Sequence, residues 1–134
     1  MYLLDTNICI YAMKDKFPQL TKKLFEITPT EICISSVTVG ELAYGVAKSK
    51  QKERSKYVLD IFLSAYNILP FDEEDAIVFG KIRALLNNQG TPIGPYDLQI
   101  ASQGVSKGLV VVTHNVKEFC RIPNLNFEDW VISL

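Results

Sequence analysis

The sequence predicts an α/β fold with a mainly parallel central sheet and helices on both faces. Short apolar runs bounded by polar residues alternate with segments whose apolar residues recur at helical spacing. Buried strands that alternate with helices are typical of parallel sheets, whose right-handed crossovers cover both faces. Because no repeat and no Pro/Gly/Ser-rich linker interrupts the pattern, we expect residues 1–134 to form a single domain.

The predicted elements follow one another in a regular order. The strands are the apolar runs at residues 2–4, 32–34 and 109–112, with a weaker fourth run at residues 67–71. The helices are the segments with helical spacing, at residues 8–13, 20–27, 37–47, 57–66, 76–86 and 98–105. Helices therefore separate successive strands, as parallel pairing requires.

Two helix boundaries carry local signals. Asp72 can cap a helix whose first turn holds Glu73, Glu74 and Asp75, and acids in that turn are favoured at the positive end of the helix dipole. Gly90 suits the carboxyl end of this helix. Pro95 fits the first position of the next helix, where its missing N–H has no partner. Asp97 is therefore expected in the first turn of that helix.

Composition and charge exclude several classes of protein. The chain is 48% hydrophobic and 22% charged, as expected of a globular domain rather than a disordered one. Its net charge of −1 argues against a protein that coats nucleic acid by charge alone. Cys9, Cys33 and Cys120 form no Cys-x-x-Cys pair and predict small buried thiols in a reducing compartment. Without a signal peptide or an apolar run of about 18 residues, we expect a cytoplasmic protein with no membrane contact.

Three acidic residues lie where the predicted strands or loops lead into helices. Asp5 directly follows the first strand, which places it at the carboxyl end of that strand, and it can also cap the following helix. Glu41 stands among apolar neighbours, where it marks either the solvent edge of a helix or an inward-facing acid. Asp97 can simply favour the helix dipole. Each acid alone is ambiguous.

Together, the three acids predict a metal site. The carboxyl ends of parallel strands meet at one edge of the sheet, where such folds bind ligands. Two carboxylates about 4 Å apart would repel by roughly 4 kcal/mol at an effective dielectric of 20, so the cluster needs a bound cation or a shared proton. Oxygen ligands suit Mg²⁺ or Mn²⁺, and such an ion suits phosphodiester hydrolysis. The residues therefore predict metal-assisted cleavage of a phosphate ester.

The end of the predicted strand at residues 109–112 adds polar residues to the same edge. Thr113 and Asn115 can hold water, a metal or a phosphate oxygen, and Glu118 is either an outer acid of the site or surface charge. His114, the only histidine, is a candidate general base. A metal site can generate hydroxide without it, and a single loop histidine is commonly just solvated, so we leave it outside the predicted catalytic set.

Four motifs in order resemble the PIN-domain family, in particular VapC-type toxins. They are Leu3-Leu4-Asp5-Thr6-Asn7, Ser35-Ser36 with Glu41-Leu42 and Gly45, Gln89-Gly90 with Ile93-Gly94-Pro95-Tyr96-Asp97, and Val112-Thr113-His114-Asn115 with Glu118-Phe119. The resemblance ends with Glu128-Asp129-Trp130 and implies a three-layer PIN-like fold. It further implies a Mg²⁺- or Mn²⁺-dependent endoribonuclease that acts as the toxin of a type II toxin–antitoxin pair. Such a toxin is usually dimeric, is neutralised by a cognate antitoxin and reaches operator DNA through it.

Carried over by position, the resemblance assigns the site residues. It implies that Asp5, Glu41 and Asp97 hold the metal, with Thr6 and Thr113 lining the site. Asn115 takes the place where many PIN domains have Asp, which weakens any second metal site, and Glu118 partly compensates. We therefore expect one ion in the free protein, with any second ion arriving with the RNA phosphate.

Contacts with RNA and with protein partners are predicted less sharply. The segment from Lys48 to Lys56 has a local charge of +4 and is either an RNA contact or a solvated helix start. Further basic candidates are Lys14, Lys16 and Arg83. Four apolar residues are interpreted first as part of the core and, as the alternative, as a dimer or antitoxin surface. These residues are Tyr57, Phe62, Phe79 and Leu85.

Two alternatives to an endoribonuclease remain. One is a PIN-like interaction module without catalysis that acts with an antitoxin on operator DNA, which the three acids disfavour. The other is a phosphatase-like or receiver-like domain. Its opening Asp would have another acid nearby, whereas Thr6 and Asn7 follow Asp5, and no Gly-rich phosphate loop is present.

Overall fold

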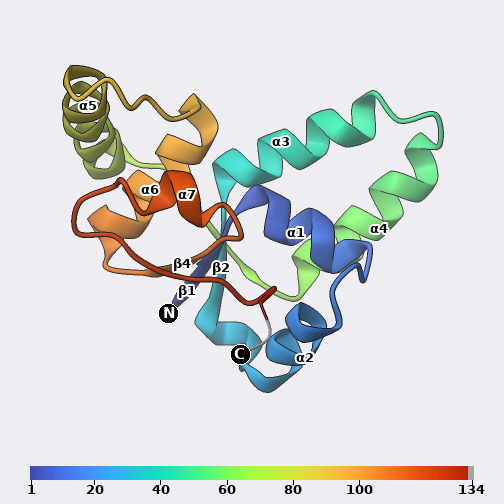
Figure 1. The fold of residues 1–134 in the computed structure, drawn as a ribbon. Helices are drawn as coiled ribbons and strands as arrows, with labels where there is room; N and C mark the ends of the chain where they lie inside the picture. The colour runs from blue at the N-terminus through green and yellow to red at the C-terminus, as the bar shows by residue number, and fades with distance from the viewer. Residues whose placement is uncertain (133–134) are drawn as a thin grey trace.

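Five parallel strands form the central sheet of the computed structural model, which describes residues 1–132 (Figure 1). The sheet order is β3-β2-β1-β4-β5, and every neighbouring pair is parallel. The strands are β1 (Tyr2–Leu4), β2 (Ile32–Ser35), β3 (Asn67–Leu69), β4 (Val110–Val112) and β5 (Asn126–Glu128). The helices are α1 (Thr6–Met13), α2 (Pro18–Glu26), α3 (Ser36–Ala47), α4 (Lys52–Ser64), α5 (Glu73–Asn88), α6 (Pro95–Lys107) and α7 (Val116–Phe119), with a 3₁₀ turn at Pro29–Glu31.

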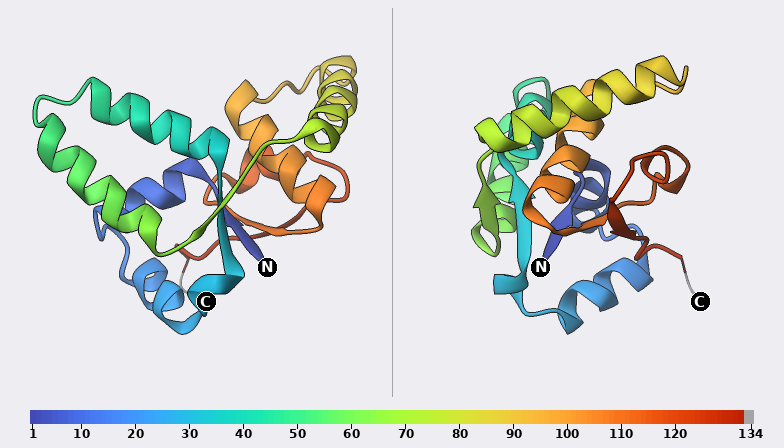
Figure 2. Two further views of the ribbon diagram at one scale, coloured as in Figure 1. Left: turned by 180° about the vertical axis from the view of Figure 1, so that it is seen from behind. Right: turned by 90° about the vertical axis from the view of Figure 1, so that its left-hand side faces the viewer.

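Helices cover both faces of this sheet, as predicted. Leu3 and Val111 belong to the core beneath α5 and α6, whereas their neighbours Leu4 and Val112 belong to the core beneath α1, α2 and α4. Figure 2 shows the α3–α4 pair and the α5–α6 pair on opposite sides of the strands. Because successive side chains face opposite ways and both faces are buried, β1, β2 and β4 are continuous apolar runs. The predicted α/β fold class is confirmed.

The structure corrects several element boundaries. Strand β5 was not predicted, because its Asn-Phe-Glu sequence at the sheet edge lacks an apolar run. Helix α4 lies over Lys52–Ser64 rather than residues 57–66, so its first turns are basic and solvated. Helix α5 begins at Glu73, so the predicted cap at Asp72 is confirmed, and Asp72 and Asp75 form a reciprocal capping box. The expectation of three buried thiols is wrong for Cys120, which is exposed, although Cys9 and Cys33 are buried.

The close approach of α6 to β4 depends on Gly104. A Cβ at this position would meet Val111 Cγ2 at 2.5 Å and Leu125 Cδ1 at 3.2 Å. We expect Gly104→Ala to lower the free energy of unfolding by about 1–3 kcal/mol, because the crowded core must shift. Urea denaturation would measure this change. The matched control is Gly80→Ala in α5, where a Cβ meets nothing within 4 Å, and it should leave stability equal or higher by up to about 1 kcal/mol. Equal stability changes in the two variants would contradict this account.

Within residues 1–132, no helix has both the length and the apolar character needed to cross a membrane.

Candidate active site

Asp5 sits at the carboxyl end of β1, where α1 begins. It is 2% exposed, and its N–H donates to the carbonyl of Val112 at 3.0 Å, which fixes it between β1 and β4. Its carboxylate accepts a hydrogen bond from the Ile8 N–H at 2.8 Å and so caps α1. The predicted capping role of Asp5 is therefore confirmed, and the capping hydrogen bond holds its buried carboxylate at the edge of the sheet.

Glu41 faces this edge and not only the solvent. Thr6, 8% exposed, donates its hydroxyl proton to Glu41 Oε1 over 2.7 Å. The Thr6 hydroxyl also lies 3.0 Å from the buried hydroxyl of Thr38, one turn before Glu41 on α3. The pair of threonines connects the start of α1 to α3. The sequence did not single out Thr38, because one threonine in an apolar helix carries no distinctive pattern.

Asp97 lies in the first turn of α6, as predicted, and is electrostatically coupled to the other acids. Burial, together with the negative charges of Asp5, Glu118 and Glu41, raises the pKa of Asp97 to about 6. This coupling brings all four acids into one site.

Burial also raises the pKa of Asp5. A hydrogen bond from the Thr113 side chain and the bond from the Ile8 N–H oppose this rise, whereas the charges of Glu41 and Asp129 add to it. Two neighbouring carboxyl groups thus both resist ionisation in the metal-free protein. A cation between them would relieve this repulsion.

The segment after β4 supplies the remaining predicted residues. Thr113 is fully buried, and its hydroxyl accepts a hydrogen bond from the Asn115 N–H at 3.0 Å. The Asn115 side-chain amide donates to Glu118 Oε2 at 3.0 Å. Asn115 therefore holds Glu118 at the site, where the Glu118 charge acts on Asp97. Of the two interpretations of Glu118, the structure favours an outer acid of the site.

Asp129 is a residue of this edge to which the sequence analysis gave no role, although it lies in the last motif of the resemblance. Its side chain is 8% exposed, one carboxylate oxygen lies 2.8 Å from His114 Nδ1, and the other accepts from the Val131 N–H at 2.9 Å. Asp129 follows β5 just as Asp5 follows β1, so recognition of β5 as a strand would have revealed it. His114 is thus held by a partner rather than simply solvated.

The donor set fits a partly hydrated hard cation. Among residues 1–132, no three His, Cys, Asp or Glu side chains converge closely enough to form a ready-made metal cage. Mg²⁺ typically binds proteins through one or two carboxylates and keeps several waters, so it does not require such a cage. Carboxylate oxygens suit this ion, and Asp5, Glu41 and Asp97 are the residues that would hold it.

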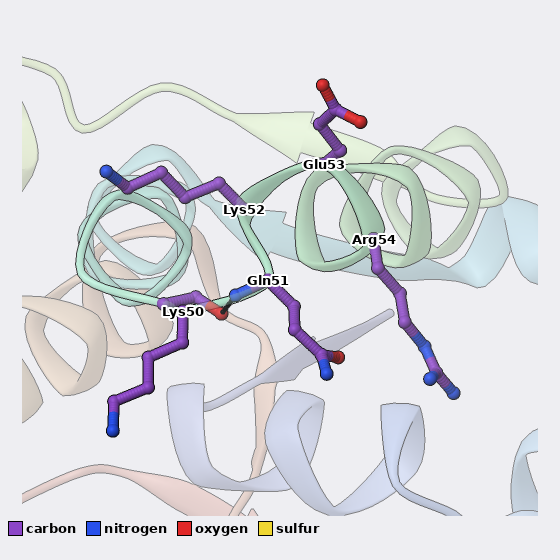
Figure 3. Close-up of a pocket in the computed structure, with 6 residues that line it drawn as sticks. Lys50, Gln51, Lys52, Glu53 and Arg54 are labelled. Atoms are coloured by element: carbon purple, nitrogen blue, oxygen red, sulfur yellow. Dashed lines mark hydrogen bonds between the residues drawn. The ribbon is translucent and has the colours of Figure 1, made fainter.

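Basic residues border the site on the side of Glu41. A groove of about 680 Å³ between α1, α3 and α4 is lined by Glu41 together with Lys14, Lys48 and Arg54. Around the start of α4, Lys50, Lys52 and Arg54 point in different directions, and Glu53 points away from Lys50 and Arg54 (Figure 3). The basic run therefore does not form one flat surface. Only part of it lies in the groove beside the acids.

Comparison with known proteins identifies the family. A sequence model of the PIN domain matches residues 2–125. The chain belongs to the PIN-domain family. It is 46% identical over 129 residues to the tRNA(fMet)-specific endonuclease VapC of Salmonella typhimurium, covering 96% of this chain and 97% of that one. It is 44% identical over 132 residues to ribonuclease VapC2 of Rickettsia felis, covering 97% and 98%. The resemblance to VapC-type PIN domains is therefore confirmed.

Solved PIN-domain structures agree with this assignment. A crystal structure of VapBC2 from Rickettsia felis bound to a DNA fragment from its promoter matches with a TM-score of 0.90. The match has 43% sequence identity and covers 96% of this chain and 98% of that one. A DNA-bound VapBC structure from Salmonella typhimurium matches with a TM-score of 0.91 at 46% identity, covering 96% and 97%. The three-layer PIN-like fold is therefore confirmed.

Proposed function

We propose that this PIN domain is a Mg²⁺-dependent endoribonuclease and the toxin of a type II toxin–antitoxin module. The observation that carries the proposal is the placement of three acids at one edge of the sheet. Asp5 follows β1, Thr6 at the start of α1 binds Glu41 at 2.7 Å, and Asp97 lies in the first turn of α6, where the charges of the other two act on it. Mutual repulsion of buried and half-buried acids destabilises a fold, so the clustering of these side chains indicates a functional site. The endonuclease and ribonuclease names of VapC relatives at 44–46% identity support RNA as the substrate.

The residues of the site divide into two groups by what they do. Asp5, Glu41 and Asp97 would hold the cation, which when bound supplies charge stabilisation for phosphate oxygens and acidifies water. Thr6 and Thr113 orient two of these carboxylates through their hydroxyl groups.

Asn115 and Glu118 lie at the outer side of the site and act on Asp97. Because Asn115 donates to Glu118, that carboxylate stays beside Asp97 and adds negative charge without a further acid at position 115. This arrangement supports one well-held ion in the free protein. Mn²⁺ suits the same oxygen donors.

The proposed substrate is a structured RNA with unpaired bases. The Salmonella typhimurium relative is named for the initiator tRNA, which makes tRNA(fMet) the first RNA to test. Lys14, Lys48 and Arg54, which share the groove with Glu41, are placed to contact the RNA backbone.

We further propose a cognate antitoxin as protein partner, with operator DNA reached through it in the cytoplasm. The matching VapBC structures, two of them bound to DNA, support this arrangement. A homodimer remains a prediction. It has support from Tyr57 and Leu85, whose side chains are 67% and 40% exposed. The interpretation of these two residues as core is therefore wrong. Phe62 and Phe79 are half-buried and pack against the core.

Cleavage of RNA by the purified chain tests the proposal. We expect Mg²⁺ or Mn²⁺ to support cutting of tRNA(fMet), and EDTA to abolish it because the carboxylates alone cannot activate water. Gel analysis of total RNA with and without chelator measures both activity and target, and Mg²⁺ added in excess of EDTA is the control. Undiminished cleavage in EDTA would contradict metal dependence. A chain that binds no metal and cuts no RNA would favour the non-catalytic interaction module.

A further inference from the structure

An aromatic and basic patch borders Asp5, Glu41 and Asp97, which we call the acidic centre, and nothing in the proposed mechanism uses this patch. We call it the aromatic rim, and it consists of Tyr11, Lys16, Phe17 and His114. The Phe17 ring lies edge-on to Tyr11 with centroids 5.1 Å apart and is tilted by 50° to His114 at 6.2 Å. Lys16 Nζ lies 5.2 Å from the Tyr11 centroid and 5.4 Å from the Phe17 centroid. Phe17 is half-buried, whereas Lys16 and His114 are exposed.

The rim is built as a rigid surface. Asp129 holds the imidazole of His114 through Nδ1 at 2.8 Å, and this carboxylate is itself fixed by the Val131 N–H. Tyr11 supports Phe17 from α1. The rings of Phe17 and His114 are tilted and not stacked on one another, so their faces are not paired with each other.

The rim adjoins the reaction site and carries the charge that RNA requires. His114 directly follows Thr113, whose side chain contacts Asp5. Lys14 and Lys16 are exposed in the connection from α1 to α2, and the carboxylate of Asp15 between them accepts a hydrogen bond from Thr21 at 2.6 Å. Half-buried aromatic rings beside exposed lysines match single-stranded RNA, whose bases stack on aromatic side chains while its phosphates meet cations.

We propose that the aromatic rim stacks an unpaired RNA base next to the phosphodiester that lies at the acidic centre. This inference rests on the proposed ribonuclease function and adds a base-binding subsite to it. Phe17 supplies the stacking ring, the exposed Lys16 beside it supplies a cation for the neighbouring phosphate, and His114 forms the side of the subsite nearest Asp5. Stacking accepts any base, so the subsite positions the strand and favours unpaired over paired RNA.

Steady-state cleavage of a short RNA hairpin with an unpaired loop tests this subsite. We expect Phe17→Leu to raise KM on the order of tenfold with kcat within about threefold of wild type, because one base loses its aromatic platform. Phe17→Tyr should restore the wild-type KM. The same comparison is made on a set of abasic hairpins, each of which lacks one loop base beside the cleavage site. For at least one of these hairpins, wild type and Phe17→Leu should have the same KM. That hairpin identifies the stacked base.

Controls separate stacking from folding and from the proposed function. Phe25→Leu removes an 88% exposed ring from α2 and should leave KM unchanged. Circular dichroism melting shows whether Phe17→Leu is folded, and Lys16→Ala, at an exposed position, should raise KM in the same direction. Equal KM for wild type and Phe17→Leu, or an equal rise on intact and all abasic hairpins, would overturn the subsite alone. A wild-type chain that cuts neither hairpin nor tRNA would overturn the proposed function and the subsite with it.

Discussion

Replacement of Asp97 by Asn is expected to lower the rate of RNA cleavage by at least about 10³-fold, since the metal site loses a charged ligand that stabilises the transition state. Asp5→Asn should have a loss of similar size. Asn is nearly as good a helix cap as Asp, so Asp5→Asn keeps the hydrogen bond that begins α1 and the fold survives. Asp5→Ala would remove that cap as well, at a cost of about 1 kcal/mol, and would mix the two effects.

Single-turnover cleavage of labelled tRNA(fMet) in saturating Mg²⁺ would measure these losses. The matched control is Asp60→Asn, which removes an equivalent charge from an exposed position on α4. It should retain wild-type cleavage. Near-wild-type rates for both Asp97→Asn and Asp5→Asn would exclude the acidic centre as the site of chemistry.

Strands with two buried faces were predictable from the sequence, whereas of the two edge strands β3 was predicted only as a weaker run and β5 was not predicted. β1, β4 and the first three residues of β2 are apolar because helices cover both faces of the sheet, and this pattern is visible in the sequence without any knowledge of tertiary contacts. β5 pairs only with β4 and has one half-buried residue, Phe127, between two exposed ones. Its polar composition hid both the strand and Asp129 at its end.

The candidate site was predictable where topology alone fixes a residue. Asp5, Thr113 and Asp97 follow a strand or begin a helix, so their approach to one edge follows from chain order. The orientation of Glu41 does not, because apolar residues surround it in the sequence and either face of α3 was possible. The Thr6 hydroxyl settles that orientation through a contact 35 residues away in the chain. Contacts of this kind also explain why Thr38 was missed.

Burial and repulsion of Asp97 in the acidic centre make the stability of the metal-free fold depend on pH. Asp97 has a folded-state pKa of about 6, above its ordinary value of 3.8, so the folded protein binds the proton more tightly than the unfolded chain does. The resulting stability is fully present below about pH 3.8 and is lost as pH rises through 6. The variant Asp97→Asn mimics the neutral acid. Without metal at pH 7.5, we therefore expect its free energy of unfolding to exceed that of wild type by on the order of 2 kcal/mol, with a correspondingly higher melting temperature. The difference should shrink to about zero near pH 4.

Mg²⁺ should reverse this order. The ion binds the ionised carboxylates of the folded state, so at pH 7.5 it raises the melting temperature of wild type by linkage and affects Asp97→Asn much less. Protonation of Asp97 competes with the ion, so cleavage should fall about tenfold per pH unit below pH 6, and a higher Mg²⁺ concentration should move that midpoint to lower pH. Thermal melts of both variants from pH 4 to 8, with Mg²⁺ and with EDTA, would measure the stability terms. A wild type that is more stable than Asp97→Asn at pH 7.5 in EDTA would show that Asp97 serves the fold, and the link between its burial and metal binding would then fail.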